Sequence, residues 1–151
     1  MSVERQLSIF LENEPGALAH LSRRLAHAHV NIVAVFVPES SDQGVLRLVV
    51  DDPNQAKALL KKEGIPFAET QVLALRMPNQ PGALFDVTRK MAKAGIDIKY
   101  AYGTTNSGEQ TMIIFHVSDL SQAVKLFDHP QPHGAQNFRR HEKQYVNRSM
   151  R

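Results

Sequence analysis

The sequence contains an internal repeat. Asn-Glu-Pro-Gly-Ala-Leu at residues 13–18 returns as Asn-Gln-Pro-Gly-Ala-Leu at residues 79–84, and the similarity continues through 15–37 and 81–103. A repeat of this length is a whole small domain rather than one unit of a solenoid. Domains of this size bury a smaller fraction of their surface than larger domains do, only about 60%, and are marginally stable alone. The repeat therefore predicts two related domains that share an interface.

Both copies carry the same order of predicted elements. In the first copy, alternating apolar residues before the Pro-Gly turn predict a strand, and apolar residues at helical spacing after it predict a helix. Further strands are predicted at 31–37, 45–50 and 66–71, and Asp52-Pro53 is typical of the start of a second helix. This order is that of the ferredoxin-like sandwich. The predicted fold class is therefore α+β, with two ferredoxin-like βαββαβ sandwiches in tandem.

The repeat also sets the predicted domain boundaries. The first domain is expected at residues 1–71, the second at 72–139, and a basic tail at 140–151. Because almost no linker separates the domains, the last strand of the first is expected to run directly into the first strand of the second. The final strand of the second copy, expected at 133–139, has little apolar pattern. The polar tail is expected to be disordered or to form a short docked helix.

Composition narrows the class of protein. The chain has no cysteine, which excludes disulfides and cysteine-ligated metals. Basic and acidic side chains balance over residues 1–127, so the net charge of +3 comes from the C-terminal residues, and nucleic acid is not an expected partner. We find no signal-peptide pattern and no apolar stretch long enough to span a membrane. We therefore expect a cytoplasmic protein that does not associate with membranes.

The sequence gives little support for catalysis. There is no legible nucleophile–base pair and no Gly-x-Ser-x-Gly elbow. His129 and His133 are spaced like metal ligands, but they lie in the polar tail. His116 has the strand parity opposite to Phe115, which predicts that the two side chains lie on opposite faces of the sheet. We therefore expect a non-enzyme with no metal and no cofactor.

The Pro-Gly turn before the first helix suggests a binding site. Glycine permits a tight turn and close approach of a ligand, and the amides of 16–18 lie at the positive end of a helix dipole, which favours a carboxylate. The Asn13 amide suits an ammonium group or a carboxylate, and Asn31 is expected near the same turn. The second copy places Asn79 and Asp97 at the matching positions. A Pro-Gly turn is also a common purely structural device.

Both copies resemble ACT domains, small regulatory modules that bind amino acids. The residues that carry the resemblance are the two Asn-x-Pro-Gly-Ala-Leu segments and the strand starts at Asn31-Ile32 and Asp97-Ile98. The resemblance implies ligand binding at the first strand–helix loop, often completed by a neighbouring ACT domain. Leu11 and Met77 stand where some amino-acid-binding members have histidine. The ligand-binding residues it implies are Asn13, Glu14, Pro15, Gly16, Ala17, Leu18, Asn31 and Ile32, with Asn79, Gln80, Pro81, Gly82, Ala83, Leu84, Asp97 and Ile98 in the second copy.

The predicted function is non-catalytic sensing of a free amino acid. The ligand is expected to bridge domains of a homodimer-forming protein that acts on a separate metabolic enzyme. One alternative is a structural dimerisation or partner-binding module, using the apolar edge at Val33, Val35 and Val37. A second alternative is an RNA-binding sheet, for which Tyr100 and Tyr102 are the stacking candidates, although we favour an interface or core position for both.

Overall fold

The computed structural model describes residues 1–12, 14–38, 44–104 and 108–128. In chain order the elements are β1 (Ser2–Leu11), α1 (Ala17–His27), β2 (Ile32–Phe36), β3 (Gly44–Val50), α2 (Pro53–Lys62), β4 (Phe67–Pro78), α3 (Ala83–Lys93), β5 (Ile98–Thr104), β6 (Gln110–Val117) and α4 (Leu120–Phe127). The order confirms the predicted α+β class. Asn13, the strand predicted at 133–139, His129, His133 and the tail lie outside the described residues.

The strands form one six-stranded antiparallel sheet in the order β2-β3-β1-β4-β6-β5. Strand β4 joins the two copies without a break, as the missing linker predicts. It pairs with β1 from Phe67 to Ala74 and with β6 from Leu73 to Pro78. The first residues of β1 therefore lie beside β4 at the edge where a fourth strand of the second copy would pair. The sheets of the two predicted sandwiches are thus fused into one.

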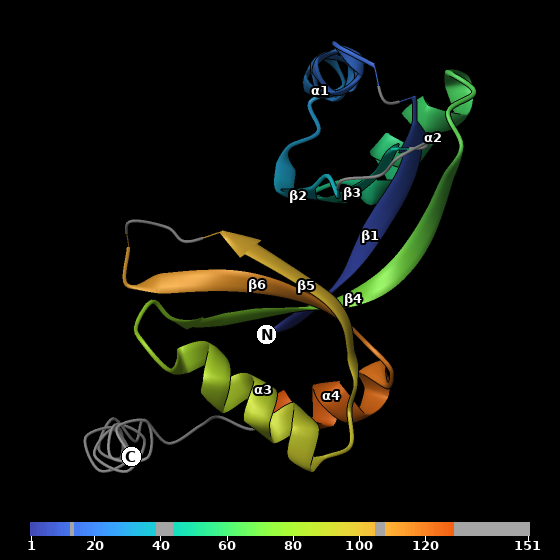
Figure 1. Ribbon diagram of the computed structural model, residues 1–151. Helices are drawn as coiled ribbons and strands as arrows, with labels where there is room; N and C mark the ends of the chain where they lie inside the picture. The colour runs from blue at the N-terminus through green and yellow to red at the C-terminus, as the bar shows by residue number, and fades with distance from the viewer. Residues whose placement is uncertain (13, 39–43, 105–107, 129–151) are drawn as a thin grey trace.

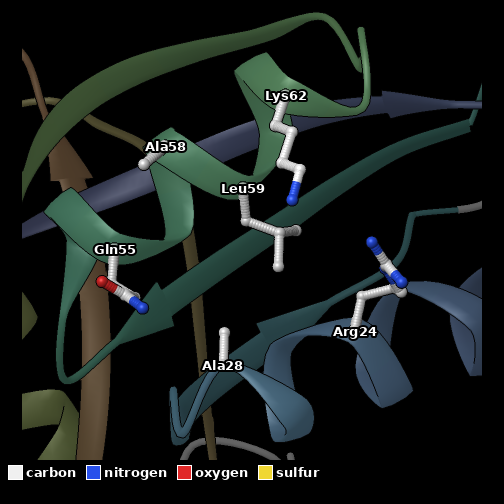
Figure 2. Close-up of a pocket in the computed structure, with 6 residues that line it drawn as sticks. All are labelled: Arg24, Ala28, Gln55, Ala58, Leu59 and Lys62. Atoms are coloured by element: carbon white, nitrogen blue, oxygen red, sulfur yellow. The ribbon is translucent and has the colours of Figure 1, made fainter.

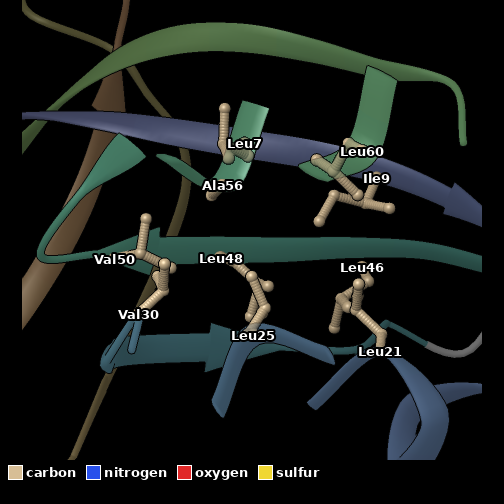
Figure 3. Packing of buried hydrophobic residues seen from close by; sticks show 10 residues of the cluster. All are labelled: Leu7, Ile9, Leu21, Leu25, Val30, Leu46, Leu48, Val50, Ala56 and Leu60. Atoms are coloured by element: carbon tan, nitrogen blue, oxygen red, sulfur yellow. The ribbon is translucent and has the colours of Figure 1, made fainter. Parts of the chain in front are cut away.

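All four helices pack on the same face of this sheet. Leu7 and Ile9 of β1 pack with Leu21 and Leu25 of α1 and with Leu60 of α2 in the first core (Figure 3). The second core is built in the same way by β4, β6, α3 and α4, around the following buried side chains: Leu73, Leu75, Met77, Met91, Phe115, Val117 and Ala123. The apolar spacing predicted from the sequence is therefore the spacing that the cores use.

The sheet folds back on itself, so that its helix-free surfaces meet. Figure 1 shows β1 and β4 as long curved strands, with β2 and β3 facing β5 and β6 and the helices outside. We call this contact the seam. Its apolar part is the buried cluster Ala34, Val49, Val72, Ala74 and Ile114. Its polar part consists of Gln6, Arg47, Tyr100, Tyr102 and His116, and the Phe36 ring stacks on Tyr102 beside them.

Within the described ranges, no helix has the length and apolar character needed to cross a bilayer.

Candidate functional site

The first strand–helix loop is a tight turn that only glycine suits well. Gly16, with φ 91°, precedes α1 in the left-handed region, and no side chain caps the helix. The turn is held by Glu14 N–H donating to the Glu12 carbonyl at 2.9 Å and by Ala17 N–H donating to the Glu14 carbonyl at 3.3 Å. The sequence motif therefore produces an uncapped helix start, directly after an exposed loop.

A cavity of about 490 Å³ opens at this loop. Its lining includes the predicted residues Glu14, Pro15, Gly16 and Ala17. The remaining lining residues come from the end of β1, from α1 and from the turn before β4: Phe10, Leu11, Glu12, His20, Leu21, Gly64, Ile65 and Pro66. Leu18, also predicted, is exposed. The first cavity is therefore built entirely from the first copy.

The second copy repeats the arrangement. Gly82 has φ 89°, no side chain caps α3, and Ala83 N–H donates to the Gln80 carbonyl at 3.3 Å. A smaller cavity of about 280 Å³ lies at this loop. Its lining comes from the second copy alone: Met77, Pro78, Asn79, Gln80, Ala83, Leu84, Gly103, Thr111 and Ile113. Of the predicted residues, Pro81 and Gly82 complete the turn without lining the cavity.

The backbone amides available to a ligand differ from the predicted ones, which were those of residues 16–18. The Ala17 and Ala83 amides already donate to turn carbonyls, so they are not free. In the described part of the chain, the next amides of each helix, those of Leu18 and Ala19 and of Leu84 and Phe85, have no backbone acceptor. Unpaired first-turn amides at the positive end of a helix are the groups that bind anions.

The prediction that Asn31 lies near the Pro-Gly turn is wrong. Ile32 is opposite Val50 in the β2–β3 ladder, whereas the loop follows Leu11, which is opposite Gly44 at the other end of β3. The physical reason is that α1 runs back along β1, so β2 begins at the far end of the sheet. Asn31 N–H donates to Asp51 there at 2.8 Å.

Asp97 is displaced from its loop for the same reason. Ile98 is opposite Val117, while the loop follows Pro78, which pairs with Gln110 at the other end of β6. Asp97 N–H donates to the Ser118 hydroxyl at 2.9 Å, as Asn31 does to Asp51 in the first copy. Asn31-Ile32 and Asp97-Ile98 therefore close strand ends, and none of the four lines the cavity of its own copy.

A further cavity, of about 270 Å³, lies between α1 and α2 and was not predicted (Figure 2). Arg24 and Lys62 stand at its rim, and Arg24 is paired with Glu63. In the second copy, Gln122 Nε2 donates to the Ala94 carbonyl at 3.1 Å across the equivalent groove. The groove between the helices is therefore crossed by a hydrogen bond in the second copy and holds a cavity in the first.

The polar part of the seam is organised by Gln6, which is fully buried. Gln6 Nε2 donates to the Tyr100 hydroxyl at 2.6 Å, and the Tyr102 hydroxyl donates to Gln6 Oε1 at 2.8 Å. The Arg47 guanidinium lies over the Tyr100 ring, 4.2 Å from its centroid, and His116 packs against the same ring at 4.9 Å. The tyrosines are therefore interface residues, and they are not presented for stacking on RNA bases.

Burial shifts the pKa values of two side chains in the seam. Desolvation raises the pKa of the Tyr102 phenol, and neighbouring Tyr100 adds to this effect against the opposing influence of Arg47. Burial lowers the pKa of His116, and the positive charges of Lys99 and Arg47 lower it further. The phenol therefore remains a hydrogen-bond donor and the imidazole stays neutral at neutral pH. Among the described residues, no three candidate ligands come together to hold a metal.

Residues 1–128 match the family model of the ACT domain pair. The chain belongs to the ACT domain pair family. This ACT domain pair is 32% identical to protein BT0572 from Bacteroides thetaiotaomicron, with TM-score 0.79 over 83% of this chain and 87% of that one. No curated protein sequence is significantly similar to it.

More distant structures share the fold of this ACT domain pair. The ligand-free regulatory subunit of aspartate kinase from Thermus thermophilus is 13% identical, with TM-score 0.58 over 75% of this chain and 82% of that chain. Aspartate kinase from Synechocystis is 15% identical, with TM-score 0.55 over 82% of this chain and 25% of that chain. At these identities the likeness concerns the fold.

Proposed function

We propose that this ACT domain pair is a non-catalytic sensor, which binds a free amino acid at its strand–helix loops and regulates a separate metabolic enzyme. The observation that carries the proposal is that both copies combine a cavity with a glycine-initiated, uncapped helix start at the same loop. The similarity of its fold to a regulatory subunit of aspartate kinase supports a regulatory role.

The carboxylate of the amino acid would lie at the helix start. In the first copy it would accept hydrogen bonds from the Leu18 and Ala19 amides, which have no backbone acceptor in the described part of the chain. The helix dipole adds a favourable interaction with a negative charge at this position. Leu84 and Phe85 offer the same amides in the second copy.

The ammonium group needs acceptors that differ between the copies. Glu12 and Glu14 line the first cavity and provide carboxylates, whereas Asn79 and Gln80 provide amide oxygens in the second. Asn31 and Asp97 do not take this role within their own copy, because they lie at the other end of the sheet. We expect the two sites to differ in affinity or in ligand.

Each cavity is lined by one copy, so a ligand there does not bridge the two copies of one chain. We propose that a second chain covers the loops in a homodimer. Large apolar side chains stand exposed beside them: Phe10 and Leu18 at the first loop, and Leu84 and Phe85 at the second. Burying such side chains favours association.

The test is a thermal-shift screen against the twenty amino acids, repeated on Ala17→Asp and Ala83→Asp. A carboxylate at the first helical position favours the helix itself but repels a bound carboxylate and narrows the cavity. One or more amino acids should stabilise the wild-type protein, by about 2.7 kcal/mol at 100 times the dissociation constant. Each variant should lose the stabilisation contributed by its own copy while remaining folded.

Asn54→Asp is the matched control, because it adds a carboxylate to the first turn of α2, away from both loops. It should respond to amino acids like the wild-type protein. A screen in which no amino acid raises the melting temperature would reject the sensor and favour the dimerisation module. A shift that survives in both loop variants would place the amino acid elsewhere.

A further inference from the structure

The seam has an internal pseudo-symmetry that follows from the repeat. Phe36 and Tyr102 occupy equivalent positions in the two copies, and their rings stack on each other at 5.5 Å and 14°. A side chain stacked on its own repeat counterpart marks the pseudo-twofold axis that relates the copies. Every other seam position therefore occurs twice, once on each side of this axis.

The two sides have diverged in opposite directions. On one side lie Ala34 and Val49 of the first copy with Val72 and Ile114 of the second, all buried in an apolar cluster. Their repeat counterparts form the other side: Tyr100 for Ala34, His116 for Val49, Gln6 for Val72 and Arg47 for Ile114. Packing alone does not require these four polar residues, because the apolar side closes the same surfaces without them.

The polar side contains a cation that aromatic rings contact, Tyr100 at 4.2 Å and Phe36 at 5.9 Å, but that no carboxylate of the described residues balances. None of the carboxylates in the described part of the chain lies within 4.0 Å of the Arg47 guanidinium. Its Nε is buried without a hydrogen-bond partner, and so is Nδ1 of His116. Arginine cannot lose its charge, so its desolvation is not relieved by deprotonation. Two such groups on one side of an interface call for a missing partner, which is either bound water or a ligand.

The missing partner is expected to be negatively charged. Lys99 lies close enough to His116 to lower its pKa, as Arg47 does, so the local field is positive. Gln6 already bonds both tyrosine hydroxyls and is not available to Arg47. The two Nη atoms of Arg47 are not among its buried unpaired atoms, so solvent can reach them.

We propose that the polar side of the seam is a second ligand site, separate from the loop cavities, that binds a small oxyanion at the Arg47 guanidinium. Carboxylates and phosphates share the geometry that an arginine fork recognises. Since Arg47 comes from β3 and the Tyr100 and His116 rings come from β5 and β6, an anion there links the two copies. Its occupancy therefore strengthens the seam.

The probes are sodium acetate and sodium phosphate at millimolar concentration, each compared with sodium chloride at equal ionic strength. The wild-type melting temperature should rise by several degrees with at least one oxyanion. Arg47→Ile, which installs the residue found at the equivalent position of the second copy, should abolish the rise. Arg76→Ile, the matched loss of an exposed cation on β4, should retain it. Phosphate also stabilises proteins without binding, because it is excluded from their surface. This effect should be the same in both variants, so it does not produce a difference between them.

A second readout on the wild-type protein keeps the test independent of how well Arg47→Ile folds. The imidazole resonances of His116 should shift saturably as the oxyanion is added. The pKa of His116 should rise, because a bound anion offsets the positive charges of Arg47 and Lys99. Acetate alone would identify a carboxylate ligand, and phosphate alone a phosphate ligand. Equal thermal shifts in wild type and Arg47→Ile, or His116 resonances that do not respond to either anion, would overturn the proposal.

Discussion

At the scale of single residues, Gln6 determines how two tyrosine hydroxyls in the seam are hydrogen-bonded. It is the buried polar residue of the described core, and it satisfies one tyrosine hydroxyl as a donor and another as an acceptor. A side-chain amide can do both at once, because it carries an NH2 donor and an oxygen acceptor. Its repeat counterpart, Val72, forms no such bond, so the position by itself does not demand a polar group.

Gln6→Val should destabilise the protein by about 1–3 kcal/mol, because the Tyr100 and Tyr102 hydroxyls lose their partner in a buried site. Urea unfolding measures the loss. Tyr102→Phe should also destabilise, but the double variant should cost less than the sum, since the hydroxyl left unpaired by Gln6→Val is then absent. Strict additivity would show that the hydrogen bond contributes nothing to stability.

His116 gives the seam a pH dependence with a definite sign. Its pKa is lowered from the ordinary 6.5 by burial, then by Lys99 and Arg47, so the unfolded chain binds the proton more tightly than the folded one. Stability is full above about pH 6.5 and falls as the pH drops through the lowered pKa. His116→Phe keeps a ring against Tyr100 without a titrating group, so unfolding midpoints should decline less on acidification. Parallel pH profiles would contradict this.

At the scale of the elements, local sequence signals predict where the helices begin. The Pro-Gly turns predict where α1 and α3 begin, and Asp52 and Asp119 cap the next helices by accepting from Gln55 and Gln122 amides, at 3.0 and 2.8 Å. Pairing across the copies has no such local signal. The extension of β1 along β4 depends on the register between Ser2 and Ala74, and the displacement of Asn31 depends on the direction of α1.

Two glycines near the ends of elements are constrained in different ways, Gly16 by its backbone conformation and Gly103 by the space around it. At Gly16 a Cβ would meet nothing within 4 Å, so Gly16→Ala should cost only the left-handed backbone strain, about 1–2 kcal/mol. At Gly103 of β5 a Cβ would lie 2.8 Å from both the Met112 carbonyl oxygen and Ile113 Cγ1. Gly103→Ala should therefore cost more, because backbone must move. Chemical denaturation of both variants measures the difference, and equal losses would contradict the distinction.

At the scale of the whole molecule, the two copies form a single structural unit. Strand β4 contributes Phe67 to the edge of the first core and Leu73, Leu75 and Met77 to the second, and the seam covers the helix-free surfaces of both. The prediction that His116 and Phe115 lie on opposite faces of the sheet is confirmed, but the sequence did not predict that Arg47 and His116 meet in a contact between the copies. The signal that could have revealed them is their mismatch with Ile114 and Val49 when the two copies are aligned.

The shared strand should make unfolding cooperative. Urea denaturation followed by far-ultraviolet circular dichroism and by tyrosine fluorescence, which reports on Tyr100 and Tyr102 in the seam, should give one coincident transition. A fragment of residues 1–71 should be unfolded or self-associated, because it exposes Val49 and loses the second half of β4. Two resolved transitions would mean that each copy is stable by itself.

Joining the copies in one chain has an evolutionary consequence at the seam. In a homodimer of single domains, any substitution at an interface is inherited by both sides of the twofold axis. Two copies of the first domain alone would place Arg47 and Gln6 on both sides, with no tyrosine pair or histidine opposite them. Covalent duplication removes that symmetry constraint. It allows one side of the axis to be a buried cluster of valine, alanine and isoleucine while the other carries an arginine, a glutamine, a histidine and a tyrosine.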